Sequence, residues 1–262
     1  MTTHTEDERG AGSLGDHPSV ADAPVATGSR ATQVLGAITL VAVAVWAYLG
    51  LLGTPADEVQ QQSVRLLYVH VPVVSVAYLA CFLTSFASAM WLWKKSQWWD
   101  LVASSSGEIA AVFTAATLAS GAIWGGTAWG TFWAWDARLT STALLFMLLL
   151  GYLAVRRMPA SREVRGRVSA IVGLLLTPNI FIINRSVEWW RSLHQDPTLF
   201  DPSLSPKIHD LMLFTMVYSL GVGMLVFAWL LIHRFRVAYL QDQLDDLGLD
   251  QALSERRAEA GT

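Results

Sequence analysis

Six stretches of the sequence are long and apolar enough to cross a membrane. They span roughly residues 34–53, 66–91, 107–124, 139–155, 168–184 and 210–232. A helix needs about 20 mostly apolar residues to cross the hydrocarbon core, and backbone groups inside lipid must be hydrogen-bonded within the segment. The alternating pattern of a membrane barrel is absent. We therefore expect an all-α, polytopic integral membrane protein with six transmembrane helices.

The composition supports this class and argues against others. Hydrophobic residues make up 53% of the 262-residue chain and charged residues only 15%, which is too apolar for a disordered or an ordinary soluble protein. The net charge of -3 gives no basis for binding nucleic acid, so the bilayer is the expected environment. The single cysteine, Cys81, lies in an apolar run and can form neither an internal disulfide nor a CxxC site.

The chain divides into a membrane domain and two tails. Residues 1–30 are polar and rich in Gly, Ala and Ser, which is typical of a disordered tail, and they lack the basic start and apolar core of a signal peptide. Residues 31–236 hold the six spans. Residues 237–262 form a charged tail that is suited to a short surface helix.

The charges in the connections predict the orientation in the membrane. Lys and Arg are enriched on the cytoplasmic side of short loops. One set of connections carries ten of them: Arg30, Lys94, Lys95, Arg156, Arg157, Arg162, Arg165, Arg167, Arg234 and Arg236. The other set carries five: Arg65, Arg138, Arg185, Arg191 and Lys207. Both termini are therefore expected in the cytoplasm, and the loops at 54–65, 124–140 and 185–209 on the outer side, in the periplasm or its equivalent.

Two histidines fall on this predicted outer side. His70 lies in the otherwise apolar run LLYVHVPVVSVAY, and ionisable residues inside spans are candidates for function. Pro72 follows it and would free a backbone carbonyl and bend the helix. His194 follows Trp190 by four residues, so the two share a face if this segment is a short surface helix. A packing role for His70 and an interfacial role for His194 are the alternatives, but their shared side favours a joint function.

The same side also gathers six of the twelve tryptophans. They are Trp124, Trp129, Trp133, Trp135, Trp189 and Trp190. An aromatic belt at the headgroup level explains rings near helix ends, but it poorly explains four rings in one loop. Gly125, Gly126 and Gly130 permit close backbone approach and positive φ between these rings. The pattern favours a surface for a large, flat and mostly apolar ligand.

Haem fits this combination of side chains. Imidazole is a common axial ligand of haem iron, tryptophan rings can line the macrocycle, and arginine binds carboxylates such as the propionates. Chlorophyll or quinone would use some of these features without requiring two histidines. The sequence contains no CxxCH, so we expect non-covalent haem b.

Three segments resemble one family of membrane proteins. WGTFWAWDARLT resembles the WWD motif of the haem-handling proteins of cytochrome c biogenesis, and LLYVHVP and VEWWRSLHQ resemble the two histidine segments of haem exporter protein C, the CcmC family. The resemblance covers roughly residues 60–235. It implies that His70 and His194 are the axial ligands. It also implies a haem platform made by the six tryptophans and Asp136. The candidates for binding propionates or ordering the loop are Arg65, Arg138, Arg185 and Arg191.

The resemblance also implies partners. They are the periplasmic haem chaperone CcmE, the ATP-binding-cassette transporter subunits CcmA and CcmB, and the small membrane subunit CcmD. The sequence has no GxxxxGK[ST] loop, so ATP hydrolysis would come from a partner and this chain would be a transfer subunit rather than an enzyme.

Two other functions remain open from sequence. A cytochrome c haem lyase shares the WWD motif, although lyases of this superfamily are usually longer and have further histidines. A haem-conducting channel would need polar groups along a path through the membrane. Glu108 and the Thr177-Pro178-Asn179 sequence are the few candidates for such a path.

Overall fold

The computed structural model describes residues 28–194 and 210–260, and within these ranges it is helical apart from short connections. In these ranges, six helical stretches are long and apolar enough to cross a membrane. No strand occurs in the described part of the chain. The β-type pairing there is an isolated antiparallel bridge between Asp57 and Gln61. The expected all-α, six-helix membrane architecture is thus confirmed. Residues Gly28–Ala238 form one compact unit.

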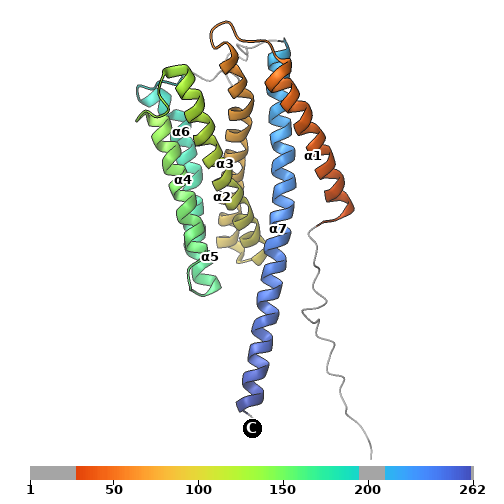
Figure 1. Cartoon of the computed structure of the whole chain (residues 1–262). Helices are drawn as coiled ribbons and strands as arrows, with labels where there is room; N and C mark the ends of the chain where they lie inside the picture. The colour runs from red at the N-terminus through yellow and green to blue at the C-terminus, as the bar shows by residue number, and fades with distance from the viewer. Residues whose placement is uncertain (1–27, 195–209, 261–262) are drawn as a thin grey trace, which may run out of the picture. The chain divides into compact units, whose positions relative to one another are not determined.

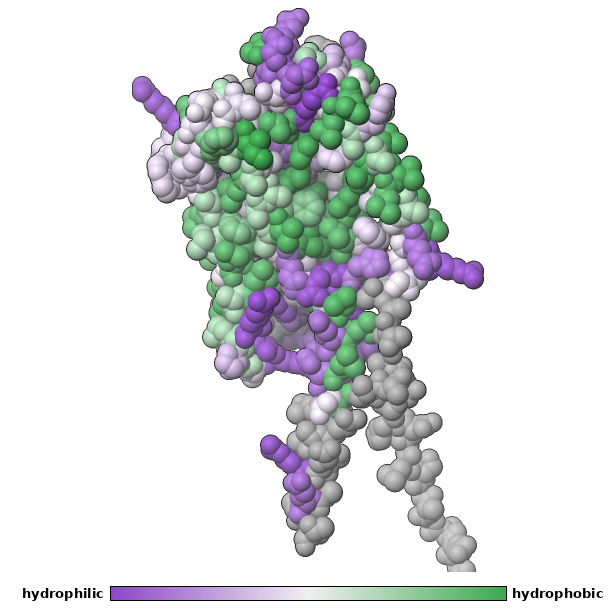
Figure 2. All heavy atoms as spheres, viewed as in Figure 1, coloured by the Kyte–Doolittle hydropathy of each residue, from purple (hydrophilic) through white to green (hydrophobic). Residues whose placement is uncertain are grey.

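The helices follow the chain order shown in Figure 1. They are α1 (Arg30–Tyr48) with the π-helical turn η2 (Leu49–Gly53), the 3-10 turn η3 (Gln62–Leu66), α2 (Leu67–Lys94), α3 (Gln97–Trp129), α4 (Ala137–Arg156), α5 (Arg162–Leu174), α6 (Leu176–Trp189) and α7 (Asp210–Ala260). Neighbouring helices α2 and α3, α3 and α4, and α4 and α6 lie side by side. In Figure 2 an apolar band crosses the visible face of the bundle, with hydrophilic side chains beyond its edges.

The third helix is longer than the sequence pattern predicted. α3 continues to Trp129, so Trp124, Gly125 and Gly126 are helical instead of lying in the loop that was expected from residue 124. The helix ends at Gly130, whose φ of 73° is the left-handed conformation that commonly terminates helices. The loop between α3 and α4 is therefore only residues 130–136.

The two last spans also differ from the simplest expectation. The fifth span is two helices, because Pro178 lacks an N–H and its ring collides with the carbonyl of Leu174, where α5 ends. The Ser85 hydroxyl of α2 donates to the Gly173 carbonyl at 2.7 Å beside this break. The expected separate helix after residue 237 is instead a continuation of α7.

Close packing at a glycine and polar side-chain contacts join the helices of the bundle. A Cβ on Gly107 would lie 2.5 Å from the ring of the fully buried Tyr152, so only glycine allows α3 to approach α4 this closely. Glu108 pairs with Arg234 of α7, and Asn179 donates to the Ser141 carbonyl at 3.1 Å. These two polar side chains, which the sequence offered as parts of a transmembrane path, therefore have contacts that join helices.

Candidate functional site

A cavity of about 630 Å³ lies at the end of the bundle where α2 begins and α3 ends. Its volume is in the range of sites for small molecules and cofactors, roughly 300–1,000 Å³. Its walls come from α2, α3, α4, α6, the segment after α6 and the segment before η3. Five of the residues singled out in the sequence line it: His70, Trp124, Trp129, Arg138 and His194.

His70 occupies the first turn of α2, and its hydrogen bond fixes its tautomer. Nδ1 of His70 lies 2.9 Å from the hydroxyl oxygen of Ser120 on α3. That hydroxyl donates its proton to the Ala116 carbonyl at 2.7 Å, so its oxygen accepts from the imidazole. The ring proton is therefore on Nδ1, and Nε2 keeps its lone pair. The ring also packs at 5.9 Å from that of Trp124, tilted by 49°.

The proline beside His70 ties the same turn to α1. Pro72 removes the donor that would bond the Tyr68 carbonyl within α2. That carbonyl accepts from the indole Nε1–H of Trp46 at 2.9 Å. The predicted release of a backbone carbonyl is confirmed, and its partner on α1 was not foreseen. Gly121 leaves room for the imidazole, because a Cβ there would lie 3.1 Å from Cε1 of His70.

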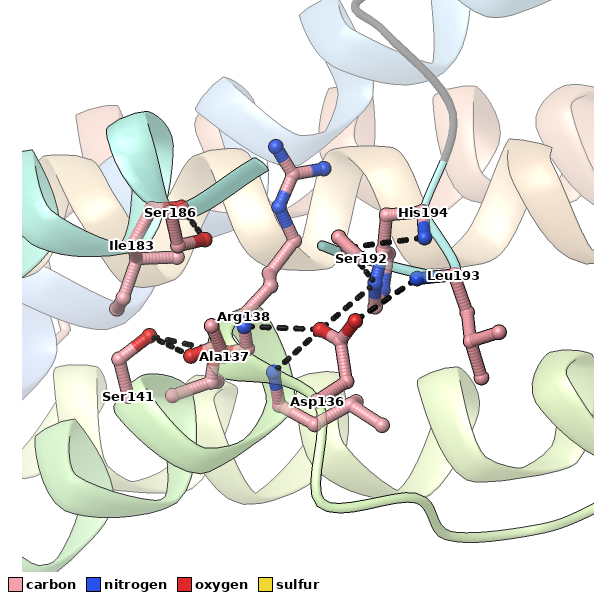
Figure 3. Close-up of polar contacts among 11 residues, drawn as sticks. Asp136, Ala137, Arg138, Ser141, Ile183, Ser186, Ser192, Leu193 and His194 are labelled. Atoms are coloured by element: carbon pink, nitrogen blue, oxygen red, sulfur yellow. Dashed lines mark hydrogen bonds and ion pairs between the residues drawn. The ribbon is translucent and has the colours of Figure 1, made fainter. Parts of the chain in front are cut away.

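Asp136 connects the start of α4 to the segment that carries His194 (Figure 3). It is the N-cap of α4, and Oδ1 accepts from the Arg138 N–H at 2.9 Å. Oδ2 accepts from the Leu193 N–H at 2.9 Å. Burial raises the pKa of this carboxyl, but bonds from Ser192 and the N–H groups of Leu193 and Arg138, with the nearby His194, outweigh burial and lower the pKa. Asp136 is therefore ionised at neutral pH.

His194 lies outside any helix. α6 ends at Trp189 and Trp190 is extended, so the helical face that Trp190 and His194 would have shared is not formed. The His194 ring instead packs edge-on at 4.7 Å from that of Trp129, and its Nδ1 is 3.2 Å from Oδ1 of Asp136. Burial, followed by the positive charge of Arg138, lowers the pKa of His194 against the opposing effect of Asp136. The imidazole is therefore neutral at neutral pH.

The six tryptophans separate into two groups. Trp124 and Trp129 line the cavity. The other four lie outside its walls and are exposed, and we call them the outer tryptophans: Trp133, Trp135, Trp189 and Trp190. They form two edge-on pairs, with ring centroids 5.6 Å apart in the first and 5.7 Å in the second. The structure thus does not place all six rings around one ligand position.

The four arginines also have different surroundings. Arg138 lines the cavity, and Figure 3 shows its guanidinium extended away from the Asp136 carboxylate. Arg185 pairs with Glu188 at 2.8 Å. Arg65 donates to the side chain of Gln62 at 2.7 Å and to the Thr54 carbonyl at 3.2 Å. Arg191 is exposed.

Sequence reasoning missed several polar residues of the site, among them Gln60, Asn184 and Ser120. Gln60 lines the cavity and accepts from the Trp124 indole N–H at 3.2 Å, and no sequence signal marks it. Asn184 also lines the cavity and could have been noticed as a polar residue at the end of a predicted span. Ser120, which orients His70, is one of many serines in α3 and would not stand out.

Comparison with known proteins identifies the relatives of this chain. The family model described as Heme exporter protein C matches residues 19–248. Heme exporter protein C of Haemophilus influenzae is 33% identical over 208 residues, which cover 78% of this chain and 83% of that protein. Its Escherichia coli (strain K12) counterpart is 36% identical over 159 residues, or 60% and 64% of the two chains. A ccmC-like mitochondrial protein of cytochrome c biosynthesis from Marchantia polymorpha is 34% identical over 190 residues, or 72% and 81%.

Proposed function

The chain belongs to the Heme exporter protein C family, and on that basis we propose that it binds haem b in the cavity through His70 and His194 and passes it to a haem chaperone. The proposal rests on one observation: the imidazoles of His70 and His194 line the same cavity as the rings of Trp124 and Trp129. The names of its relatives support a role in cytochrome c maturation.

The side chains in the cavity suit this ligand. Both histidines use Nδ1 for a hydrogen bond, which is the arrangement that metal-ligating histidines usually show, and both keep Nε2 for iron. The described residues contain no cluster of three or more His, Cys, Asp or Glu side chains that would hold a bare metal ion. Two imidazoles are sufficient for iron that a porphyrin already holds in its plane. Trp124 and Trp129 offer flat apolar contacts to that plane.

Arg138 is the best placed of the four arginines to bind a propionate, because it is the one that lines the cavity. Bound haem would be the cargo that this chain passes on. The haem iron would offer two axial coordination sites to the two imidazoles. The protein's own part is to orient two imidazoles and to cover the macrocycle with apolar side chains. Transfer without covalent attachment makes the chain a carrier subunit rather than a lyase.

The outer tryptophans are suited to a protein partner. Trp is enriched at the centres of protein interfaces, and these four exposed rings adjoin the cavity through the 130–136 loop and the end of α6. We assign this surface to the chaperone CcmE. CcmA and CcmB would supply the ATP hydrolysis that this chain lacks the phosphate-binding loop to perform, and CcmD would complete the complex.

The non-covalent mode of binding is directly testable. Protein purified from haem-replete cells is expected to carry haem b that acidified organic solvent extracts completely. Absorption spectra of the extracted haem and of the remaining polypeptide check this. Haem that stays on the polypeptide would show a covalent bond and would favour lyase-type chemistry instead.

We further propose that the cavity faces the periplasm across the bacterial inner membrane. Val59 is 90% exposed near the cavity, and Met158 is 46% exposed in the connection between α4 and α5. In intact spheroplasts, a membrane-impermeant thiol reagent is expected to label Val59→Cys and to spare Met158→Cys. The native Cys81 is buried and provides the unlabelled background. The reverse labelling pattern would invert the topology.

A further inference from the structure

We propose that Asp136 is a positioning residue, whose carboxylate holds the His194 imidazole in the tautomer and orientation that present Nε2 to haem iron. The inference rests on the proposed function, because it assigns a role toward the same haem. It also gives a role to the acidic residue of the WWD motif, since a platform of tryptophan rings does not by itself require an aspartate.

The contacts of Asp136 determine which nitrogen of His194 carries the proton. Oδ1 accepts from the Arg138 N–H, and Oδ2 accepts from the Leu193 N–H, both at 2.9 Å. A carboxylate surrounded by donors in this way is itself only an acceptor. Nδ1 of His194, at 3.2 Å from Oδ1, must therefore be the protonated nitrogen. The lone pair is left on Nε2.

The second observation is that the two histidines are held by different means. His70 belongs to α2, whose backbone hydrogen bonds fix it in the bundle. His194 lies five residues beyond the end of α6, in non-helical chain. The same carboxylate bonds to the backbone of Leu193 and to the ring of His194, and its own side chain is only 2% exposed. Asp136 thus anchors this segment to the rigid start of α4.

A carboxylate at Nδ1 also changes what the imidazole does as a ligand. The hydrogen bond makes the imidazole a stronger electron donor, and such partners are worth about 10–100-fold in metal affinity. Stronger donation favours ferric over ferrous iron, so it lowers the reduction potential of the haem. Removing the carboxylate should therefore weaken haem binding and raise the midpoint potential.

The competing explanation is that Asp136 is only the N-cap of α4. Asparagine caps helices about as well as aspartate, so Asp136→Asn preserves the cap. Its neutral amide has a single oxygen and cannot accept both from the cap donors and from the Leu193 N–H. Asp136→Ser is a second variant that also caps well, but its side chain is too short to reach His194. A purely structural role predicts that both variants behave like the wild type toward haem.

The test measures haem affinity and midpoint potential in the full-length protein, together with thermal unfolding of the haem-free form. We expect both Asp136 variants to fold and to unfold in one cooperative transition, to bind haem about 10–100-fold more weakly and to show a more positive potential. Ser161→Ala is the matched control, because it removes the N-cap of α5. It is expected to leave both haem properties unchanged.

The outcomes separate the inference from the function on which it rests. If His70→Ala/His194→Ala abolishes the haem spectrum while Asp136→Asn and Asp136→Ser keep wild-type affinity and potential, the positioning role is wrong and the haem site stands. If the double histidine variant keeps the wild-type spectrum, the haem site itself is wrong, and the role of Asp136 falls with it. Should Asp136→Asn prove unstable, Asp136→Ser decides the question by the same two measurements.

Discussion

Replacing both His70 and His194 by alanine is expected to remove the low-spin haem spectrum of the purified protein. The two imidazoles line the same cavity and each keeps an unprotonated Nε2, so their loss takes away both proposed iron ligands. The affinity for haem should fall by more than about 100-fold, because a residue that only supports a metal ligand is already worth about 10–100-fold. Titration of the haem-free protein with hemin, followed by absorption, measures this loss.

A third histidine provides the control for this experiment. His233 lies on α7, packs edge-on at 5.5 Å from Trp229 and is not among the cavity residues. His233→Ala should therefore retain the wild-type spectrum and affinity. If the double variant retained them as well, the axial assignment would fail. If His233→Ala lost them, the loss of haem would not be specific to the cavity.

Replacing Trp133 and Trp135 together by alanine is expected to block delivery of haem while leaving haem bound. Both side chains lie outside the cavity, and Trp135 is 84% exposed. Truncating one interface hot spot, a class in which Trp is enriched, costs about 2 kcal/mol or more, so the loss of even one such contact should lower the affinity for the chaperone at least about 30-fold. Transfer from the purified, haem-loaded protein to purified CcmE, followed by absorption, measures the effect.

The control for this prediction uses tryptophans at the opposite end of α2 and the start of α3. Trp93 and Trp98 are 78% and 52% exposed, so their double replacement tests whether any exposed ring matters. That variant should transfer haem normally. Loss of bound haem in Trp133→Ala/Trp135→Ala would show that these rings belong to the haem cradle, and normal transfer would remove them from the chaperone surface.

Hydrophobic patterning was sufficient to predict the membrane architecture, because the length and polarity of a span are local properties. The same rule drew attention to His70, an ionisable side chain inside an apolar run. It did not predict where α3 ends. Gly125 and Gly126 favour a loop by intrinsic propensity, yet both are helical, and a Cβ on Gly126 would lie 2.6 Å from the ring of Phe132.

The position of that helix end decides how the tryptophans are used. Because α3 reaches Trp129, Trp124 and Trp129 sit on a rigid helix at the cavity wall, whereas Trp133 and Trp135 lie in the loop that follows. These tryptophans are close together in the sequence motif, so the motif alone does not show which rings line the cavity and which lie outside it. The division follows from packing between segments and was therefore visible only in three dimensions.

The role of Asp136 was hidden from the sequence for a related reason. Its capping of α4 is a local signal, since an acidic residue stands just before an apolar helix. Its bond to Leu193 spans 57 residues of chain, and no spacing rule predicts such a contact. The motif revealed that an acidic residue follows the aromatic ones, and the fold revealed that this residue faces the second histidine.

Near-infrared magnetic circular dichroism of the ferric, haem-loaded protein tests the central claim most directly, because it identifies the axial ligands of low-spin haem. The wild-type protein is expected to show the charge-transfer band of bis-imidazole coordination. His70→Ala and His194→Ala should each lose that band. A wild-type spectrum of high-spin haem, or a bis-imidazole band that survives either replacement, would contradict the assignment of His70 and His194 as the two ligands.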